Sequence, residues 1–343
     1  MKQIQHLLTS ALLAFLASAC ATGSAPVPSP QILAVTASPT PFQANESSAA
    51  TTVAPDPYAP LTILALASRS YGGGQILDLG VLQTASSFTR YLISYPSDDL
   101  AINGFVDIPN GPGPFPVVLV LHGYVDPDEY QVETYTARYA ATFANAGFIA
   151  IHPNYRNYPP SDLGPNAFRV GYAIDVLNLI AIVNAQAGQA GLLQAANPDM
   201  IFLWGHSMGG GISLRVITVG ADVQGAVIYG SMSGDERRNF EQIRDVLSNG
   251  DRGNEELAAP DEVFQQISAI NFYERIQVPL SIHHGDIDDQ VPLAWSQELC
   301  AILQSLDKQV ECFTYHNMPH TFYGDNDDLL IRRSIEFFER YTP

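Results

Sequence analysis

Short apolar runs alternate along the chain with longer segments in which apolar residues recur every three or four positions. The runs with the length and composition of buried strands are Val117–Leu121, Met200–Trp204, Ala226–Tyr229 and Pro279–His283. Helical spacing of apolar residues is seen at Val170, Ile174, Leu177 and Ala181, and again at Ile331, Ile335 and Phe338. Strands that alternate with helices predict an α/β fold with a mostly parallel sheet and helices on both of its faces.

The region before Val117 has a different pattern. Phe88–Tyr95 and Ile102–Ile108 are predicted as antiparallel strands, because they follow one another with only a short polar connection. Leu61–Ala67 and Gln75–Leu82 are predicted as a short helix and a first strand. An antiparallel edge therefore precedes the parallel part of the sheet.

The segment from Trp204 to Gly211 reads W-G-H-S-M-G-G-G and contains the pattern G-x-S-x-G. This spacing is typical of a nucleophile elbow, in which Ser207 occupies a sharp turn between a strand and a helix. Glycines two residues to either side remove the Cβ atoms that would clash in such a turn. The amide of Met208, directly after the serine, then points toward the oxygen of a tetrahedral intermediate.

Two further candidates follow Ser207 in the order that this arrangement requires, an acid and then a histidine. The loop His284–Pro292 comes directly after a predicted strand, and it carries Asp286, Asp288 and Asp289. A helix over about 293–306 and the strand Val310–Thr314 lead to a second loop with His316 and His320. Each candidate therefore lies on a loop at the carboxyl end of a strand.

These motifs resemble those of the α/β-hydrolases, and within them the catalytic domain of the prolyl oligopeptidase family, with dienelactone-hydrolase-like esterases as close neighbours. The resemblance runs from about Phe88 to the C-terminus. Its further motifs are Leu121–Tyr124, Pro153–Arg156 and the helix from Gly171 to Asp175. It implies an α/β-hydrolase fold that needs neither a metal nor an organic cofactor.

The resemblance also implies roles for residues. Ser207 is the expected nucleophile, His320 the base and Asp288, four residues after His284, the acid; Asp286 and Asp289 are the fallback acids, and His316 is the competing base. The amide of Met208 and the amide or hydroxyl of Tyr124 are the expected oxyanion-hole donors. His206 is expected to pack beneath the site, and His152 to be a satisfied histidine at a strand end.

Other clusters leave two interpretations open. Arg156 either orders a loop or contacts substrate, or it forms a structural ion pair with Asp175. His283, His284, Asp286 and Asp288 could be interpreted as metal ligands, but a triad role for this loop is favoured and no metal is expected. Cys300 and Cys312 either form a disulfide, which export would permit, or are buried free thiols.

The connection after Tyr229 is long, because the next core strand begins only near Val278. Roughly 45 residues exceed the usual connection within a compact domain. Glu241–Leu247 and Pro260–Ile270 are predicted as short helices in it. We expect a small helical cap over about 231–275 that forms one wall of the substrate pocket; the alternative is a solvated excursion away from the site.

The N-terminus is predicted to be a targeting segment. A charged start at Met1–Lys2, an apolar stretch from Leu7 to Ala19 and the sequence Leu16–Cys20 resemble a bacterial lipoprotein signal, with Cys20 as the lipidated residue. The alternative is secretion after cleavage at Ala19. Residues 21–59, rich in Pro, Ser, Ala and Thr, are predicted to be a tether, and residues 60–343 the hydrolase domain. Export to the outer face of a bacterial membrane is expected, with a lipid anchor or as a soluble protein.

Composition narrows the classes of partner. The chain is 46% hydrophobic with a formal charge of −19, which fits a globular protein and opposes binding to nucleic acid. The same charge disfavours docking on anionic lipid, so the membrane is expected to be a partner only through the lipid anchor. A small ester or a short peptide is the expected substrate.

Three function classes follow. A prolyl oligopeptidase-like serine peptidase is the first. A carboxylesterase or polyesterase is the second, since H-S-M-G-G-G also resembles cutinase-like elbows and only a short segment precedes the core. A binding domain without catalysis on a hydrolase scaffold is the third.

Overall fold

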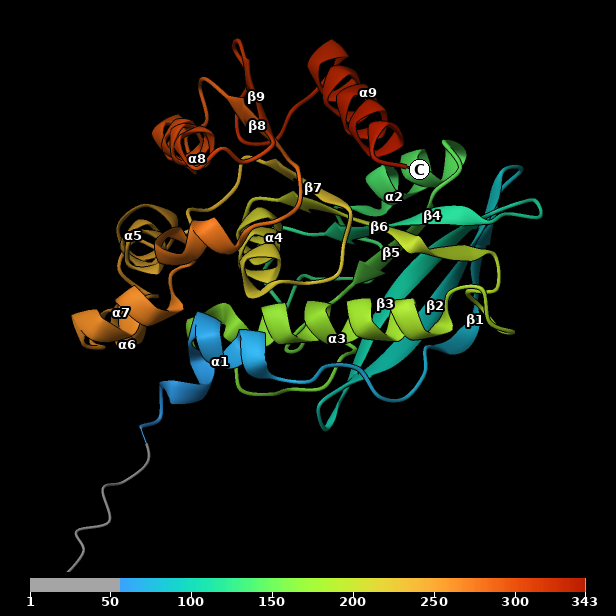
Figure 1. The fold of residues 1–343 in the computed structure, drawn as a ribbon, viewed down its shortest axis with the longest axis horizontal. Helices are drawn as coiled ribbons and strands as arrows, with labels where there is room; N and C mark the ends of the chain where they lie inside the picture. The colour runs from blue at the N-terminus through green and yellow to red at the C-terminus, as the bar shows by residue number, and fades with distance from the viewer. Residues whose placement is uncertain (1–55, 343) are drawn as a thin grey trace, which may run out of the picture. The chain divides into compact units, whose positions relative to one another are not determined.

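The computed structural model describes residues 56–342, which contain one nine-stranded sheet (Figure 1). The proposed signal segment 1–20 with Cys20, and the tether up to residue 55, lie outside the described residues. The strand order is β1-β2-β3-β5-β4-β6-β7-β8-β9. The predicted α/β-hydrolase fold is confirmed, and its sheet is mostly parallel.

The first strands form the predicted antiparallel edge. β1 (Leu77–Thr84), β2 (Phe88–Ser97) and β3 (Leu100–Pro109) pair antiparallel, and β3 pairs antiparallel with β5 (Ile149–Pro153). A short helix, α1 (Ile63–Ser68), precedes them.

The remaining strands are parallel. They are β4 (Phe115–Leu121), β6 (Ala196–His206), β7 (Gly225–Tyr229), β8 (Leu280–Gly285) and β9 (Val310–Tyr315). From β4 the chain passes to β5 on one side and then to β6 on the other, so the strand order reverses between β4 and β6. Open α/β sheets bind ligands beyond the carboxyl ends of their strands at such a reversal.

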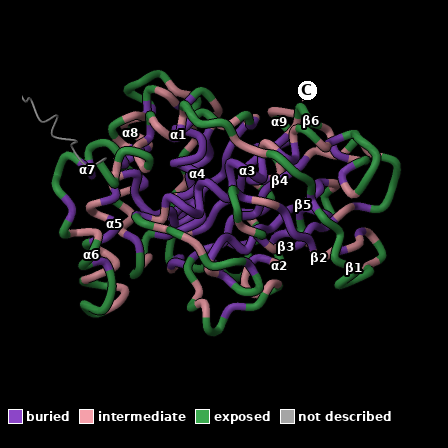
Figure 2. The backbone as a smooth tube through the Cα atoms, turned by 90° about the horizontal axis from the view of Figure 1, so that it is seen from below, coloured by how far each residue is buried: buried purple, intermediate pink, exposed green. Residues whose placement is uncertain are grey.

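Helices cover both faces of the sheet (Figure 1). The helices α3 (Val170–Gln186), α4 (Met208–Val219) and α8 (Leu293–Ser305) pack in one core layer, and α2 (Ala137–Asn145) and α9 (Asp325–Arg340) in the other. Successive side chains of β4 point to opposite faces of the sheet and so contribute to both layers. Val117 and Leu119 pack in the first layer, and Val118 and Val120 in the second. The buried residues are concentrated on the central strands of the sheet and on α3 and α4, as Figure 2 shows.

The long connection between β7 and β8 is a group of short helices, which we call the cap (residues 231–275). It contains α5 (Glu236–Gln242), a π-helical turn at Ile243–Leu247, α6 (Asn254–Leu257) and α7 (Asp261–Ile267). The helix expected at Glu241–Leu247 in fact begins at Glu236, because the side chain of Asp235 accepts the N–H groups of Arg237 and Arg238 and caps it there.

Candidate active site

Ser207 lies between β6 and α4 in a strained backbone conformation. Its φ of 54° and ψ of −117° fall outside the regions that residues with a Cβ atom ordinarily occupy. The turn is held by hydrogen bonds from Ser207 N to Tyr229 O (2.9 Å) and from Gly210 N to Ser207 O (3.0 Å). The serine is therefore fixed at the N-terminus of α4, where the next helical amide is that of Met208.

Close backbone packing requires glycine at both glycine positions of the elbow. A Cβ atom on Gly205 would meet the carbonyl group of Gly209, and a Cβ atom on Gly209 would meet the carbonyl of Leu121 on β4. Because these obstacles are backbone atoms, a side chain at either position would force the elbow apart. The glycines of G-x-S-x-G are thus required by the close approach of α4 to β6 and β4.

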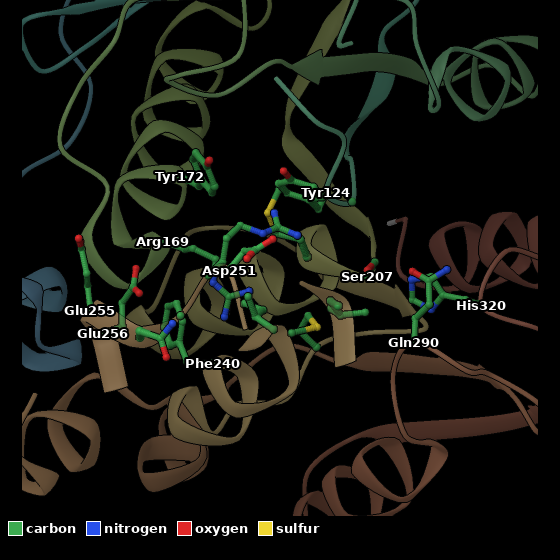
Figure 3. Close-up of a pocket in the computed structure, with 18 of the residues that line it drawn as sticks. Tyr124, Arg169, Tyr172, Ser207, Phe240, Asp251, Glu255, Glu256, Gln290 and His320 are labelled. Carbon is green, nitrogen blue, oxygen red and sulfur yellow. The ribbon is translucent and has the colours of Figure 1, made fainter. Parts of the chain in front are cut away.

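The structure brings His320 and Asp288 together on neighbouring loops. His320 Nδ1 lies 2.8 Å from Asp288 Oδ2, and their side chains are only 6% and 1% exposed. Ser207 and His320 line one pocket, which Figure 3 shows with both side chains labelled. The structure thus places the buried Asp288–His320 pair at the pocket that the elbow serine also lines.

The carboxylate of Asp288 accepts hydrogen bonds on both oxygens. Oδ1 accepts from the amides of Gln290 and Val291, at 2.9 Å each, and Oδ2 lies 3.1 Å from His284 Nε2 as well as near His320. Burial by itself raises the pKa of Asp288, but the hydrogen bonds from His284 and His320 outweigh it and hold that pKa well below its usual range. Asp288 is therefore ionised at neutral pH.

The fallback residues form a separate pair. Asp286 Oδ2 lies 2.8 Å from His316 Nδ1, and the His316 side chain is 83% exposed. Asp289 is exposed. Neither of these acids contacts His320 through a hydrogen bond within residues 56–342, so the geometry separates the buried pair from the exposed one.

His206 packs beneath the pair, as expected from sequence. Its ring packs against that of His320, with centroids 4.6 Å apart and planes tilted by 38°, and its Nε2 lies 2.9 Å from the carbonyl oxygen of His320. Burial lowers the pKa of His206 well below the ordinary value, so the ring is neutral. A neutral His206 supports the loop of His320 without adding a second positive charge beside it.

The pocket has a volume of about 870 Å³ and is lined by the sheet edge and the cap. Phe240, Ile243 and Leu247 form its cap wall. Glu255 and Glu256 lie at the end away from His320 (Figure 3). The cap thus lies over the nucleophile, as the length of the connection predicted.

Tyr124 and Tyr135 line the same pocket. The Tyr124 ring is 48% exposed and lies 4.3 Å from the guanidinium carbon of Arg252 in the cap. Tyr135, which sequence reasoning missed, stacks on His206 at 5.5 Å and has a φ of 75°. Its loop has no spacing pattern that would have singled it out.

A buried ion cluster joins the cap to the main domain. Glu236 at the start of α5 pairs with Arg169 (2.7 Å) and with Arg215 (2.8 Å), and their side chains are 7%, 16% and 4% exposed. Arg169 also lines the pocket, and the Arg215 guanidinium donates to the carbonyl of Phe168. The cluster was not predicted, because its members are far apart in sequence.

Arg156 does not line the pocket. It pairs with Asp175 at 2.7 Å, donates to the carbonyl of Pro165, and is 4% exposed. Of the interpretations left open above, the geometry supports a structural ion pair that also orders the loop after β5, and it gives no contact with the pocket.

The remaining sequence candidates are placed as follows. Cys300 and Cys312 form a disulfide between α8 and β9. His283 bonds to Ser281 and Tyr315, away from the loop of Asp288. No group of three or more His, Cys, Asp or Glu side chains with metal-binding placement is found within residues 56–342. His152 is buried at the end of β5 and bonds to Tyr130 and Thr136.

The chain is similar in sequence to known proteins. Residues 183–343 match the sequence model of the prolyl oligopeptidase family. An uncharacterized peptidase of Bacillus subtilis, YtmA, is 24% identical over 252 residues, which are 73% of this chain and 93% of that protein. Its length is therefore almost fully matched.

Solved structures with the same fold include esterases and peptidases. Acetyl xylan esterase 1 from Thermoanaerobacterium matches with a TM-score of 0.58 and 16% identity, over 77% of this chain and 88% of that one. The acylaminoacyl peptidase of Pyrococcus horikoshii matches with a TM-score of 0.57 and 18% identity, over 80% of this chain and 50% of that one. The protein is a serine hydrolase with an α/β-hydrolase fold, and its residues 183–343 are similar in sequence to the prolyl oligopeptidase family.

Proposed function

We propose that this protein cleaves an ester or peptide bond through an acyl-enzyme, with Ser207 as nucleophile, His320 as base and Asp288 as acid. The observation that carries the proposal is the buried Asp288–His320 pair beside the strained Ser207 elbow. His320 takes the proton of Ser207 as the hydroxyl oxygen attacks the acyl carbon. Asp288 holds the tautomer of His320 and stabilises its positive charge.

The developing oxyanion then needs donors. The amide of Met208 follows the nucleophile at the start of α4, and the loop with Gly123 and Tyr124 follows β4 on the other side of Ser207. The alcohol or amine leaves with the proton from His320. Water, deprotonated by the same imidazole, attacks the acyl-enzyme and releases the acid and free Ser207.

Two substrate classes remain in this proposal. A peptidase is the first, supported by the match to the prolyl oligopeptidase family and to a Bacillus peptidase. A carboxylesterase is the second, supported by the elbow string H-S-M-G-G-G, which resembles cutinase-like enzymes, and by the similarity of fold to an acetyl xylan esterase. The proposed mechanism serves either class, because ester and peptide cleavage both proceed through an acyl-enzyme.

Labelling with a fluorophosphonate probe, followed by turnover of matched acyl esters and aminoacyl amides, tests the proposal. We expect the wild type to be labelled at Ser207, and Ser207→Ala to lose labelling and about 10³-fold to 10⁶-fold in kcat with the fold intact. Turnover at the wild-type rate by a folded Ser207→Ala variant would exclude the mechanism. An unlabelled, inactive but folded wild type would favour a binding domain.

We also propose export, on the lipoprotein-like pattern that ends at Cys20. Lipid anchoring predicts that a Cys20→Ser variant leaves the membrane fraction. An unmodified N-terminus beyond residue 20, seen by mass spectrometry, would instead support soluble secretion.

A further inference from the structure

We propose that His284 is a positioning residue for the catalytic acid, because its imidazole donates a hydrogen bond to Asp288 and thereby fixes the oxygen that holds His320. This inference rests on the triad proposed above and extends it by two residues, His284 and Ser296.

His284 lies at the carboxyl end of β8, four residues before Asp288, and is 1% exposed. Its Nε2 is 3.1 Å from Asp288 Oδ2 and 3.0 Å from the carbonyl oxygen of Val291. Its Nδ1 is 2.7 Å from the hydroxyl oxygen of Ser296, in the first turns of α8. Both ring nitrogens are therefore engaged in a site that water does not reach.

The partners fix the direction of each hydrogen bond. The Asp288 carboxylate and the Val291 carbonyl only accept, so Nε2 of His284 must carry the proton. In the neutral form of the imidazole, this single N–H is shared between the Val291 carbonyl and Asp288 Oδ2, and Nδ1 is left as an acceptor for the hydroxyl of Ser296. The resulting chain runs from Ser296 through His284 and Asp288 to His320.

Oδ2 of Asp288 is the atom shared by both imidazoles. It lies 2.8 Å from His320 Nδ1 and 3.1 Å from His284 Nε2. The amides of Gln290 and Val291 hold only Oδ1, so without His284 the one remaining partner of Oδ2 within residues 56–342 would be His320. Loss of His284 should therefore loosen the carboxylate and misalign the base.

The donor also changes the electrostatics of the pair. A carboxylate oxygen that accepts two N–H groups is a weaker acceptor for each, so removal of His284 should strengthen the bond to protonated His320. The titratable groups that face His320 are Asp288 and the neutral His206, and His284 reaches it only through Asp288. Removal of His284 should therefore move the acid limb of the pH profile upward.

The variants His284→Leu and His284→Gln separate positioning from mere packing. We expect His284→Leu to lower kcat on the order of 10-fold to 100-fold, with KM changed less than about twofold, as is typical for residues that orient a catalytic group. The acid limb of the profile of kcat/KM against pH should move upward by about half a unit to one unit. The Gln side chain can place an amide N–H near the position of Nε2, so His284→Gln should restore most of kcat and the wild-type acid limb.

His283→Leu is the matched control. His283 is the neighbouring buried histidine on β8, but its ring bonds to Ser281 and Tyr315 and not to the triad. We expect His283→Leu to lower the free energy of unfolding and to leave kcat and the acid limb unchanged. If His284→Leu fails to fold, Ser296→Ala is tested in its place, because loss of the hydroxyl donor no longer fixes the tautomer of His284. We then expect kcat to fall less, about twofold to fivefold, and the acid limb to move in the same direction.

Wild-type kcat in a folded His284→Leu variant would overturn the inference. Equal losses in the Leu and Gln variants with an unmoved acid limb would also overturn it, since they would indicate packing alone. Each variant is titrated with the fluorophosphonate probe beside the wild type and Ser207→Ala. A wild type that does not label would refute the proposed function instead, and the two failures are thus distinguishable.

Discussion

Gly230 occupies the centre of the group that surrounds His320. It follows β7 with a φ of 51°, and a Cβ atom placed on it would lie 3.3 Å from His320 Nδ1, 3.4 Å from Asp288 Oδ2 and 3.4 Å from His206 Nε2. The distance to His320 is tighter than most contacts to a Cβ atom and the other two are at the lower limit of ordinary van der Waals contact, and the atoms concerned belong to the Asp288–His320 pair and its supporting ring. The absence of a side chain at this position therefore allows acid, base and supporting ring to approach one another.

We expect Gly230→Ala to lower kcat at least about 10-fold, because the methyl group presses on the Asp288–His320 hydrogen bond. Gly220→Ala is the control, since Gly220 has a φ of 102° but an added Cβ meets nothing within 4 Å. It should lose stability, on the order of 1 kcal/mol, with unchanged kcat. Equal kinetic effects of the two variants would show that backbone strain, not contact with the Asp288–His320 pair, is responsible.

The two acid–histidine pairs on neighbouring loops offer a second comparison. Asp288→Asn should reduce kcat by about 10³-fold or more, because the amide cannot hold the tautomer or the charge of His320. Asp286→Asn breaks only the exposed bond to His316 and should leave kcat within about twofold. Steady-state kinetics of both variants show which acid is needed for activity. A large loss of kcat in Asp286→Asn would mean that the exposed pair is the functional one.

At the scale of elements, one carboxylate of the cap pairs with two arginines of the main domain. Glu236 is the counter-charge of two buried guanidinium groups, from Arg169 before α3 and Arg215 on α4. An ion cluster of this kind is costly to break by removal of one member, because the remaining charges stay buried without a partner. The cap is thus fixed to the helices that form the floor of the pocket.

Glu236→Gln should lower the free energy of unfolding by about 3 kcal/mol, measured by urea denaturation, and raise KM as the cap wall loosens. Asp245→Asn is the matched control within the cap, because the pair of Asp245 with Arg244 is exposed. It should change neither quantity. Unchanged KM in a destabilised Glu236→Gln enzyme would show that the cap wall does not contribute to substrate binding.

The cap as an element was predicted from the sequence, but its internal structure was predicted only in part. Its existence followed from the length of the connection after Tyr229, but its first helix was placed five residues late, at Glu241. Asp235 is followed by charged residues and not by an apolar periodic run, so the helix start was not apparent. Buried Glu236 could not be recognised either, because its partners come from the turn before α3 and from α4.

For the whole molecule, the alternation of strands and helices predicted the sheet, since periodicity is a local property of the sequence. The order of Ser207, Asp288 and His320 predicted their meeting, because parallel strands end at one edge. Tyr135 and the function of His284 were missed for a common physical reason. Each depends on contacts between loops whose conformation no local pattern specifies.

Buried histidines give the whole fold a pH dependence. Burial lowers the pKa of His122 to about 4 and that of His283 to about 3, and it lowers those of His152 and His206 well below the ordinary value. The unfolded chain binds protons at these groups near pH 6.5, whereas the folded protein does not. Their contribution to stability is therefore present above about pH 6.5 and is lost as the pH falls toward the folded pKa values.

We expect the urea midpoint to fall between pH 7 and pH 5, with about 2 kcal/mol lost for each of His122 and His283. His283→Gln should remove one titrating group and so flatten this dependence, although the variant itself is less stable at pH 7. The depressed pKa of Asp288 adds nothing in this window, because its stabilisation is lost only below the unfolded pKa near 4. A midpoint that stays constant from pH 7 to pH 5 in the wild type would contradict the burial of neutral histidines, and an unaltered slope in His283→Gln would exclude His283 as one of the groups responsible.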